Sequence, residues 1–343
     1  MELYVGMDVS LKETSICVVN GHGEVMSEGT VTSNPEAIAR FLADKACNAV
    51  RIGLESGPTS TWLWHALRAF GLPVICIDAR HAKAALSMQI NKSDRNDAVG
   101  IGRIMQAGWY REVQVKRLSC HAVRAVLNSR ALLVKMKRDL ENQIRGLLKN
   151  FGLVIGKAGG TTFAVQVKEY VVGTGLLHRA VSPLLEIREH VVVEIAAFDR
   201  EALRLARNDV NIRRLMTIPG IGPISALSFA AAIDEPARFK RSRSVGAYIG
   251  LTPRRYASGE IDRTGHISKC GDTMLRSYLF EAAGVLLTRV ARWCGLKAWG
   301  IRLAKRIGFN KARVAVARKL AVIMHRMWTD RTDFQWSKEE AAT

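Results

Sequence analysis

The order of short apolar runs in the first 110 residues restricts the fold of this chain more than any other feature. Residues 3–9 form an apolar run that carries Asp8 and predicts a strand, and residues 14–19 and 24–31 follow as further strand candidates. Asn34 and Pro35 are typical of the N-cap and first turn of a helix, which we predict to about residue 47. Beyond it the pattern predicts a strand over 49–54 that ends at Glu55, a helix over 60–70, a strand over 73–77 and a helix over 79–88.

Three strands followed by helix, strand, helix, strand and helix is the order of an RNase H-like domain. Other α/β folds share parts of this order, so the order alone does not identify the fold. The fold class that we predict is an α/β RNase H-like or RuvC-like N-terminal domain, a long helical middle that can form a coiled coil, and a mainly α C-terminal domain with a helix-hairpin-helix-like element. The predicted domain bounds are 1–115, 116–210 and 211–343.

The charge of the chain is strongly positive and unevenly placed. Fifty-one Lys and Arg residues against 31 Asp and Glu residues give a formal net charge of +20. Residues 1–110 hold ten basic and eleven acidic residues, a net of −1, so residues 111–343 carry +21. This excess is typical of a nucleic-acid partner, although a solvated basic surface that aids solubility has the same signature. The asymmetry predicts chemistry in the first part and nucleic-acid binding in the rest.

The middle of the chain is predicted to be helical. Residues 119–150 contain no proline and one glycine, and their apolar residues recur at spacings of three and four among basic ones. A second helix is predicted from about Pro183 to Arg207, and the Gly-rich stretch 157–175 between them is predicted to be a loop or lid. Two such helices can form a dimerising coiled-coil arm or an intramolecular bundle, and the sequence does not decide between them.

Four acidic residues in the first part of the chain occupy positions that are typical of a metal site. Asp8 lies inside an apolar strand, Glu55 ends a later strand, and Asp94 and Asp97 begin a helix at a spacing that places both on one face. In an RNase H-like sheet the first and fourth strands are neighbours, which brings Glu55 beside Asp8. Clustered carboxylates repel one another unless cations lie among them, as Mg²⁺ ions bridging a phosphate do. Singly, each acid can be a turn or helix-cap residue; together they predict a Mg²⁺ site.

The stretch TIPGIGPISA resembles the hairpin of a helix-hairpin-helix element. The backbone at Gly220 and Gly222 is predicted to approach a phosphate, with helix N-terminal amides as donors. An ordinary Gly/Pro connection between two helices has the same composition.

Residues 253–271 place Ser258 in a Gly-containing loop among basic residues that we predict to bind nucleic acid, namely Arg254, Arg255, Arg263 and Lys269. A serine hydroxyl needs a base, a metal or strong charge stabilisation to act as a nucleophile, and guanidinium groups can hold the attacked phosphate bidentately. From the residues alone, a serine before a glycine is most often only a turn residue.

Residues 301–328 predict a helical region with one apolar face and one basic side. The phosphate contacts that we predict there include Arg313, Arg318 and Lys319. A helix on a membrane surface has a similar pattern, but the charge of +21 spread over the last two thirds of the chain favours nucleic acid.

Several other classes of protein are disfavoured by the sequence. The six cysteines form no CxxC pair, which predicts buried free thiols rather than a zinc site or disulfide framework. No Walker A, HExxH or GxSxG motif is present. The N-terminus does not look like a signal peptide, and no apolar run is long enough to span a bilayer. We therefore expect a soluble, cytoplasmic protein with no membrane partner.

Taken together, the motifs resemble those of the DEDD-type insertion-sequence transposases, which pair a RuvC-like domain with a C-terminal serine-bearing transposase domain. The resemblance covers nearly the whole chain and is carried by VGMDVS, GLES, KSDRNDA, TIPGIGPISA, GLTPRRYASGE and ARVAVARKLAVIMHRMW. It implies that Asp8, Glu55, Asp94 and Asp97 are the acidic quartet of that family and that Ser258 is its nucleophile.

The resemblance also implies a mechanism and partners. Members of the family recombine DNA through a covalent phosphoserine link and are guided by a structured non-coding RNA, the bridge RNA, which pairs with target and donor DNA. They act as homo-oligomers, dimers or tetramers, with a composite site that joins the acids of one protomer to the serine of another. An RNA-guided, Mg²⁺-dependent transposase is therefore the predicted function.

Two other functions stay open on the residues alone. A RuvC-like Holliday-junction nuclease would hydrolyse DNA with water and form no protein–DNA bond. A non-enzymatic nucleic-acid-binding protein would use the acids structurally. A covalent adduct separates the transposase from the nuclease, and metal-dependent cutting separates both from the binding protein.

Overall fold

A computed structural model describes residues 1–87, 93–156 and 160–336 of the chain. Its internal contacts divide the chain into two compact units, Met1–Leu118 and Ser119–Thr343, which we describe one at a time. No helix within the described ranges combines the length and the apolarity needed to cross a membrane.

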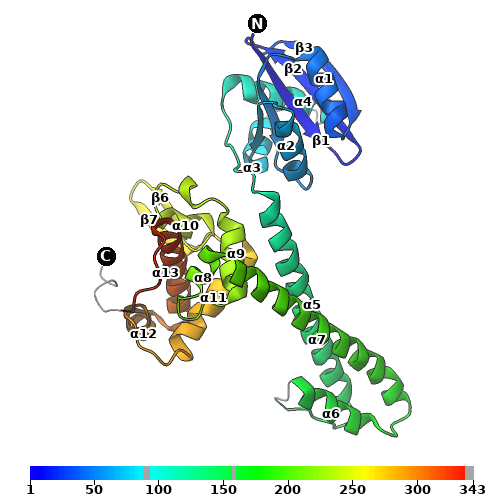
Figure 1. The fold of residues 1–343 in the computed structure, drawn as a ribbon, viewed down its shortest axis with the longest axis vertical. Helices are drawn as coiled ribbons and strands as arrows, with labels where there is room; N and C mark the ends of the chain where they lie inside the picture. The colour runs from blue at the N-terminus through cyan, green and yellow to red at the C-terminus, as the bar shows by residue number, and fades with distance from the viewer. Residues whose placement is uncertain (88–92, 157–159, 337–343) are drawn as a thin grey trace. The chain divides into compact units, whose positions relative to one another are not determined.

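The first unit is built on one mixed sheet of five strands in the order β3-β2-β1-β4-β5 (Figure 1). β1, β2 and β3 pair antiparallel, whereas β1, β4 and β5 pair parallel. Strand order and directions are compatible with the predicted RNase H-like domain. The strands are β1 (Leu3–Val9), β2 (Glu13–Asn20), β3 (Val25–Thr32), β4 (Ala49–Glu55) and β5 (Val74–Ile77).

The helices of this unit are α1 (Pro35–Lys45), α2 (Ser60–Ala69), α3 (Ala79–Leu86) and α4 (Asp94–Ala107). Each strand and helix predicted up to residue 87 is confirmed with its ends shifted by a few residues, and Asn34 caps α1 as predicted. Met88, where we predicted the third helix to end, lies outside the described residues.

The sheet is covered by helices on both faces. One face packs against α1 and α2 through a core that includes Val5, Met7, Leu42 and Leu63. The other packs against α3 and α4 through a core that includes Tyr4 and Ile101. Successive side chains of β1 therefore alternate between the two helical layers.

Gly6 allows α4 to approach β1 more closely than any other residue would. A Cβ on Gly6 would lie 2.1 Å from the carbonyl oxygen of Ala98 and 2.2 Å from the backbone nitrogen of Gly102. Both contacts are with backbone atoms, which cannot move aside as the end of a side chain can. The position of α4 over β1 thus depends on the absence of a side chain at residue 6.

We expect Gly6→Ala to destabilise the first unit by about 3 kcal/mol or more, since overpacking must displace a whole helix. Gly102→Ala is the matched control, because a Cβ there meets its nearest neighbours at ordinary distances of 3.4–3.6 Å. The control also gains helix propensity and should be neutral or stabilising. Urea denaturation followed by circular dichroism measures both. Equal stability of the two variants would contradict this account of the α4–β1 packing.

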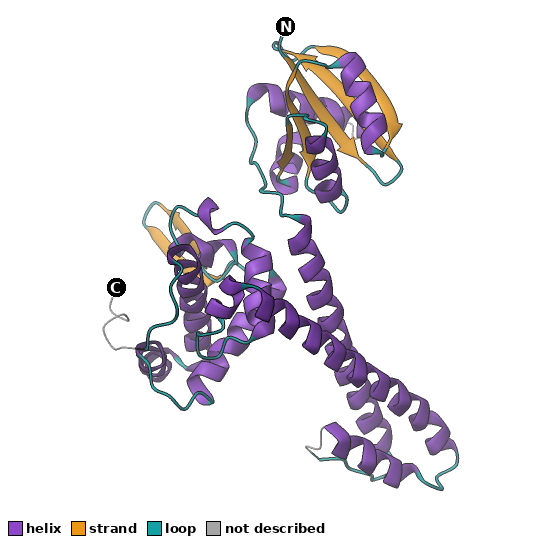
Figure 2. Ribbon diagram, in the orientation of Figure 1, coloured by secondary structure: helices purple, strands orange, loops and turns teal. Residues whose placement is uncertain are grey.

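The second unit begins with two long antiparallel helices and a short one between them (Figure 2). These are α5 (Leu118–Lys149), α6 (Gly160–Val171) and α7 (Leu176–Asn208). Ion pairs join Arg130 of α5 to Asp199 of α7 at 2.6 Å and Glu141 of α5 to Arg188 of α7 at 2.8 Å. The later residue of α5 pairs with the earlier residue of α7, so the two helices run antiparallel. A buried apolar cluster from all three helices closes the far end of this arm. The structure thus shows an intramolecular bundle, while dimerisation through the arm stays a prediction.

The segment between the long helices differs from our expectation of a loop or lid over residues 157–175. Most of it is the helix α6, which buries Phe163, Val167 and Val171 against the arm. Glycines at its ends misled the prediction, because they mark the helix termini and not an irregular segment; Gly160, Gly173 and Gly175 all have positive φ. Residues 157–159 lie outside the described part.

The body of the second unit is a helical cluster with one two-stranded sheet (Figure 2). Its elements are α8 (Val210–Leu215), α9 (Pro223–Ile233), the 3₁₀ turn η1 (Pro236–Arg238), α10 (Arg243–Tyr248), β6 (Pro253–Ser258), β7 (Ile261–Ile267), α11 (Thr273–Thr288), α12 (Gly295–Ile307) and α13 (Phe309–Asp330). The basic region predicted as one helical stretch is two helices, because Gly308, with φ of 87°, separates α12 from α13.

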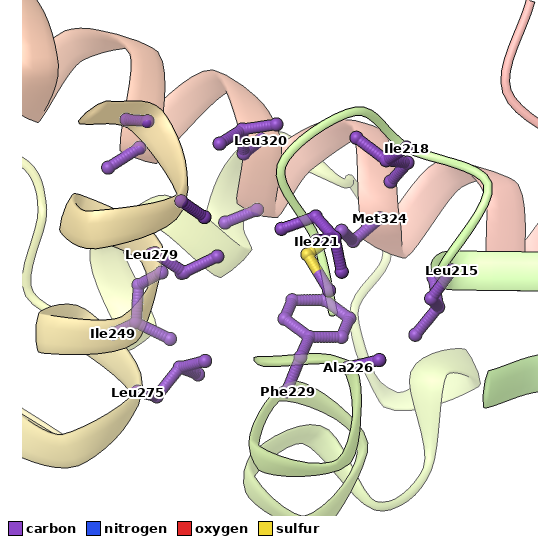
Figure 3. Close-up of a cluster of buried hydrophobic side chains, with 14 of the residues drawn as sticks. Leu215, Ile218, Ile221, Ala226, Phe229, Ile249, Leu275, Leu279, Leu320 and Met324 are labelled. Carbon is purple, nitrogen blue, oxygen red and sulfur yellow. The ribbon is translucent and has the colours of Figure 1, made fainter. Parts of the chain in front are cut away.

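The turn between α8 and α9 is anchored in the core of this body. Figure 3 shows Ile218 and Ile221 among the buried side chains of α9, α11 and α13. Pro219 and Gly220 occupy the centre of a turn closed by a hydrogen bond from Ile221 N to Ile218 O at 3.0 Å. Gly220 has φ of 88°, as the third position of a type II turn requires. The structure thus shows a tight turn between two helices, and the helix-hairpin-helix assignment stays a prediction.

Candidate active site and nucleic-acid interface

Asp8 and Glu55 lie at the ends of adjacent parallel strands and on the same face of the sheet. β1 and β4 pair in register up to Met7 and Leu54, the residues immediately before the two acids. Asp8 shares its face with Tyr4 and Gly6, and Glu55 shares its face with Gly53, whose missing Cβ would meet Met105 and Ile101 of α4. Both half-buried acids are therefore on the side of the sheet that α4 covers.

The direction of α4 brings its first turn to the same edge of the sheet. Gln106 at its end donates to Gly21 O at 2.7 Å, in the β2–β3 turn beside the start of β1. α4 therefore runs antiparallel to β1, and its N-terminal turn, with Asp94 and Asp97, lies over the end of β1 that carries Asp8. Ser93 is the N-cap of this helix, since its hydroxyl accepts from Asn96 N at 3.2 Å. Asp94 is thus not needed as the cap.

The described residues contain no group of three or more His, Cys, Asp or Glu side chains arranged to hold a metal ion. Asp8 and Glu55 end adjacent strands and the first turn of α4 lies at the same edge of the sheet, but the described side chains form no preassembled set of three ligands. Carboxylate oxygens are the ligands that Mg²⁺ prefers, and Mg²⁺ uses one or two of them with water and phosphate for the rest. The donor set fits a divalent cation, and closure of the quartet around it stays a prediction.

Asp78 is a further acid at this edge that the sequence did not single out. It follows β5 and caps α3, accepting from Arg80 N at 2.9 Å, and the Arg80 side chain lies 3.0 Å from its other oxygen. These hydrogen bonds lower the pKa of Asp78, the one from the Arg80 side chain most. The cap occupies this carboxylate, so we do not count it among the metal ligands.

Ser258 is the last residue of β6 and pairs with Ile261 across a turn at Gly259 and Glu260. Its side chain is exposed, as is nearly all of the hairpin. We expected a loop here, and the structure corrects this to a two-stranded hairpin. The hairpin holds Ser258 at its tip, where an extended partner such as a DNA strand can reach it.

The predicted basic residues around Ser258 have different surroundings. Arg254 and Arg263 are exposed on the two strands, and Arg254 donates to Ser268 O at 3.2 Å. Arg255 forms a bidentate pair with Asp262 at 2.8 and 2.6 Å, which lowers the pKa of the carboxyl group. Lys269 is exposed beyond β7. Arg255 must therefore give up a partner before it can bind phosphate, whereas Arg263 is an exposed strand residue.

The two glycines predicted to approach a phosphate also differ. A Cβ on Gly220 would meet Ala282 O of α11 at 2.7 Å, so this glycine makes room for a helix. Gly222 is the N-cap of α9, and no atom lies within 4 Å of the position of its Cβ. The geometry gives Gly220 a packing role, and a phosphate contact at Gly222 stays a prediction.

Arg313 is mostly buried, unlike its neighbours on α13. Its guanidinium carbon lies 3.7 Å from the ring centre of Phe280, and its side chain is 17% exposed. Its Nη2 donates to Phe280 O at 3.3 Å and lies 3.4 Å from a Glu281 oxygen. Arg318, by contrast, is exposed, and Lys319 is half-buried. Arg313 thus packs α13 against α11.

We expect Arg263→Gln and Arg313→Gln to separate a nucleic-acid contact from a packing contact. Arg263→Gln should reduce the slope of log K against log salt for duplex DNA by about 0.9, the effect of one phosphate contact, and leave the melting temperature unchanged. Arg313→Gln should lower the melting temperature and leave the slope unchanged. Fluorescence anisotropy at several salt concentrations measures the slopes. Equal slopes in wild type and Arg263→Gln would show that Arg263 does not contact a DNA phosphate.

The cysteines follow the predicted pattern in part. All six are free thiols, and Cys17, Cys76 and Cys294 are buried. Burial raises the pKa of Cys17 and of Cys76 to about 11, so both stay protonated at neutral pH. The prediction of burial is wrong for Cys47 and Cys270, which are exposed.

The first unit is an α/β domain compatible with the RNase H fold and carries acids at one edge of its sheet. The second unit is basic and mainly helical. Together they define a class of nucleic-acid-processing protein. Family models match both units: DEDD_Tnp_IS110, described as a transposase, over residues 5–152, and the Transposase IS116/IS110/IS902 family over residues 212–298. The chain belongs to this family of DEDD-type insertion-sequence transposases.

Relatives of known name agree with this assignment. The transposase for insertion sequence element IS1111A of Coxiella burnetii is 30% identical over 95% of this chain and 89% of its own length. A Pseudomonas aeruginosa protein named "Probable family 20 transposase" is 32% identical over 80% of this chain and 82% of its own length. The transposase for IS1328 of Yersinia enterocolitica is 26% identical over 96% of this chain and 98% of its own length.

Proposed function

We propose that this protein cuts and rejoins the DNA of an insertion sequence through a covalent link to Ser258. The observation that carries the proposal is the position of Ser258, exposed at the end of a hairpin with arginines on both strands. In the step proposed, Ser258 Oγ bonds to the scissile phosphorus and loses its proton. The P–O bond to one deoxyribose breaks, and that oxygen leaves as a hydroxyl group after gaining a proton. Attack by another DNA hydroxyl on the phosphoserine rejoins the strand and restores the serine.

The acids of the first unit serve the same reaction. Asp8, Glu55, Asp94 and Asp97 would hold Mg²⁺, which when bound supplies stabilisation of the charge that develops on the phosphate. The placement of Asp8 and Glu55 on adjacent strand ends, under the first turn of α4, supports this role. Arg263, which pairs with Tyr256 two residues before Ser258, would hold the phosphate that Ser258 attacks. Arg254, which donates to Ser268 O at the other end of the hairpin, would hold a phosphate further along the strand.

The partners that we propose are DNA, a structured guide RNA and further copies of the chain. The formal charge of +21 on residues 111–343 supports a polyanionic partner for the second unit. A guide RNA would read the target by base pairing, so the protein itself would need few contacts to base edges. The basic side chains of the second unit would suit this division of roles, because contacts to phosphates carry no sequence information.

The test is a denaturing gel of labelled element-end DNA incubated with the protein, Mg²⁺ and the non-coding RNA transcribed from the flanking DNA. We expect a labelled band that migrates with the protein in detergent and disappears after protease treatment. Recombined DNA without any such band would contradict the serine route and favour a nuclease that uses water.

A further inference from the structure

A cavity of about 760 Å³ lies in the second unit between the base of the β6–β7 hairpin and α13. α13 lines it with Lys311, Ala315, Arg318 and Val322, which recur at spacings of three and four on one side of the helix. Trp299 of α12 forms another part of the wall. β7 lines the cavity with Gly265, His266 and Ile267. Cavities of ~300–1,000 Å³ are typical of sites for small organic groups.

The lining combines an apolar wall with a basic rim. The apolar part includes Trp299, Ala315 and Val322. The basic part consists of Arg243, Lys269, Lys311, Arg318 and Lys319, and His266 lies beside them. No acidic residue is among the lining residues that the structure describes. Cations around one hollow repel each other unless an anion lies between them.

Other arginines of this unit form ion pairs with carboxylates, and the basic side chains of the cavity differ from them in this respect. Arg255 pairs with Asp262, Arg313 with Glu281 and Arg326 with Asp330. Within the described ranges, the rim side chains form no such pair with a carboxylate. The cavity therefore suits a ligand with both an anionic group and a flat apolar group.

We propose that this cavity holds one unpaired nucleotide of the bound nucleic acid. A phosphate alone would leave the apolar wall unused, and an apolar ligand would not need the basic rim. A nucleotide uses both, because its base can stack on the Trp299 ring while its phosphate binds arginine and lysine side chains. A base inside a duplex has both faces covered by its neighbours, so the nucleotide must be unpaired. The inference rests on the proposed function, which requires the second unit to bind nucleic acid.

The cavity is separate from the position of Ser258. Pro253 lines the cavity, and Ser258 lies five residues further along the same strand. At ~3.3 Å per residue, the two are roughly 17 Å apart. The nucleotide in the cavity is therefore not the one whose phosphate Ser258 attacks. Its role is to fix the strand, so that the phosphate several nucleotides away meets the hairpin tip.

The test compares three short DNA duplexes by fluorescence anisotropy: one with a single bulged thymidine, one with an abasic residue in the bulge, and one fully paired. Stacking of one base predicts that wild type binds the thymidine bulge at least about fivefold more tightly than the abasic bulge. No preference in wild type would overturn the proposal.

Ala315→Phe fills the cavity without changing its charge. We expect it to lose the preference for the thymidine bulge and keep the wild-type affinity for the paired duplex. Trp293→Leu is the matched control, since Trp293 is 57% exposed and lies outside the cavity lining; it should keep the preference. A folded Ala315→Phe protein that retains the preference would overturn the proposal.

A second measurement uses the wild-type protein and does not depend on the folding of a variant. A bulge that carries 4-thiothymidine should crosslink under ultraviolet light to Trp299 or to residues 311–322, as mapped by mass spectrometry. Crosslinks only to other parts of the chain would overturn the proposal. The same bulge in an RNA hairpin distinguishes the source, because the nucleic acid with the larger base-dependent preference supplies the nucleotide.

The outcomes separate this inference from the proposed function. If wild type shows no base preference but still forms the protein–DNA adduct, the cavity does not bind a nucleotide and the serine chemistry stands. Failure to bind any DNA or RNA would overturn both.

Discussion

Ser258→Ala should eliminate the covalent protein–DNA adduct and lower recombination by roughly 10³-fold or more, the scale of loss when a nucleophile is removed. The variant lacks one oxygen atom at an exposed strand end. Folding and affinity for DNA and RNA should therefore stay within the error of measurement, because the basic residues and the hairpin are unchanged. The denaturing gel with labelled element-end DNA measures adduct and product in one experiment.

Ser268→Ala is the matched control for this variant. Ser268 lies at the other end of the hairpin, and its backbone oxygen, which accepts from Arg254, is retained in alanine. We expect wild-type adduct and product from it. Full recombination by Ser258→Ala would end the proposed serine mechanism, and a junction nuclease that uses water would then explain the acids better.

The first unit could be predicted from sequence almost element by element, for a physical reason. Strands buried between two helical layers, such as β1 and β4, must be apolar on both faces, so an acid such as Asp8 is visible against that background. Capping residues such as Asn34 define helix starts locally. The neighbouring positions of Asp8 and Glu55 followed from the strand order, which is a property of the fold class.

The hairpin that carries Ser258 could not be predicted in the same way. Its strands are exposed on both faces and rich in arginine, so neither alternation nor an apolar run marks them. A turn at Gly259, with φ of 56°, is the one local signal. The importance of Ser258 came from the resemblance to a family and not from its chemistry, which in isolation is that of a turn residue.

The roles of individual basic residues also lay beyond the sequence. Arg313 and Arg318 stand five residues apart on one helix and look equivalent in a charge pattern. Each lies over a glycine, Gly284 for Arg313 and Gly246 for Arg318. Arg313 also stacks on Phe280 and is mostly buried, whereas Arg318 is exposed and lines an open cavity. The difference depends on which helix packs on each side of α13, and that is tertiary information.

Asp8→Asn should abolish strand cutting, with a loss of roughly 10³-fold or more, and leave DNA and RNA affinity unchanged. The amide is nearly isosteric with the carboxylate and keeps the backbone pairing with Ser15, so the sheet should persist. What it removes is one negative charge at the edge where Glu55 and the first turn of α4 meet. Asp44→Asn, a change at an exposed acid of α1, is the control and should behave as wild type.

A second readout tests the metal role of Asp8 without any catalysis. A cation that binds only the folded protein stabilises it by RT ln(1 + [L]/Kd), so Mg²⁺ should raise the melting temperature of wild type and of Asp44→Asn. Asp8→Asn should show a much smaller rise, because a direct carboxylate ligand is gone. The described residues contain no preassembled group of three ligands, so the rise should be larger when DNA supplies phosphate oxygens to complete the coordination. A Mg²⁺-dependent rise in Asp8→Asn equal to that of wild type would show that Asp8 is not a ligand, whatever its effect on cutting.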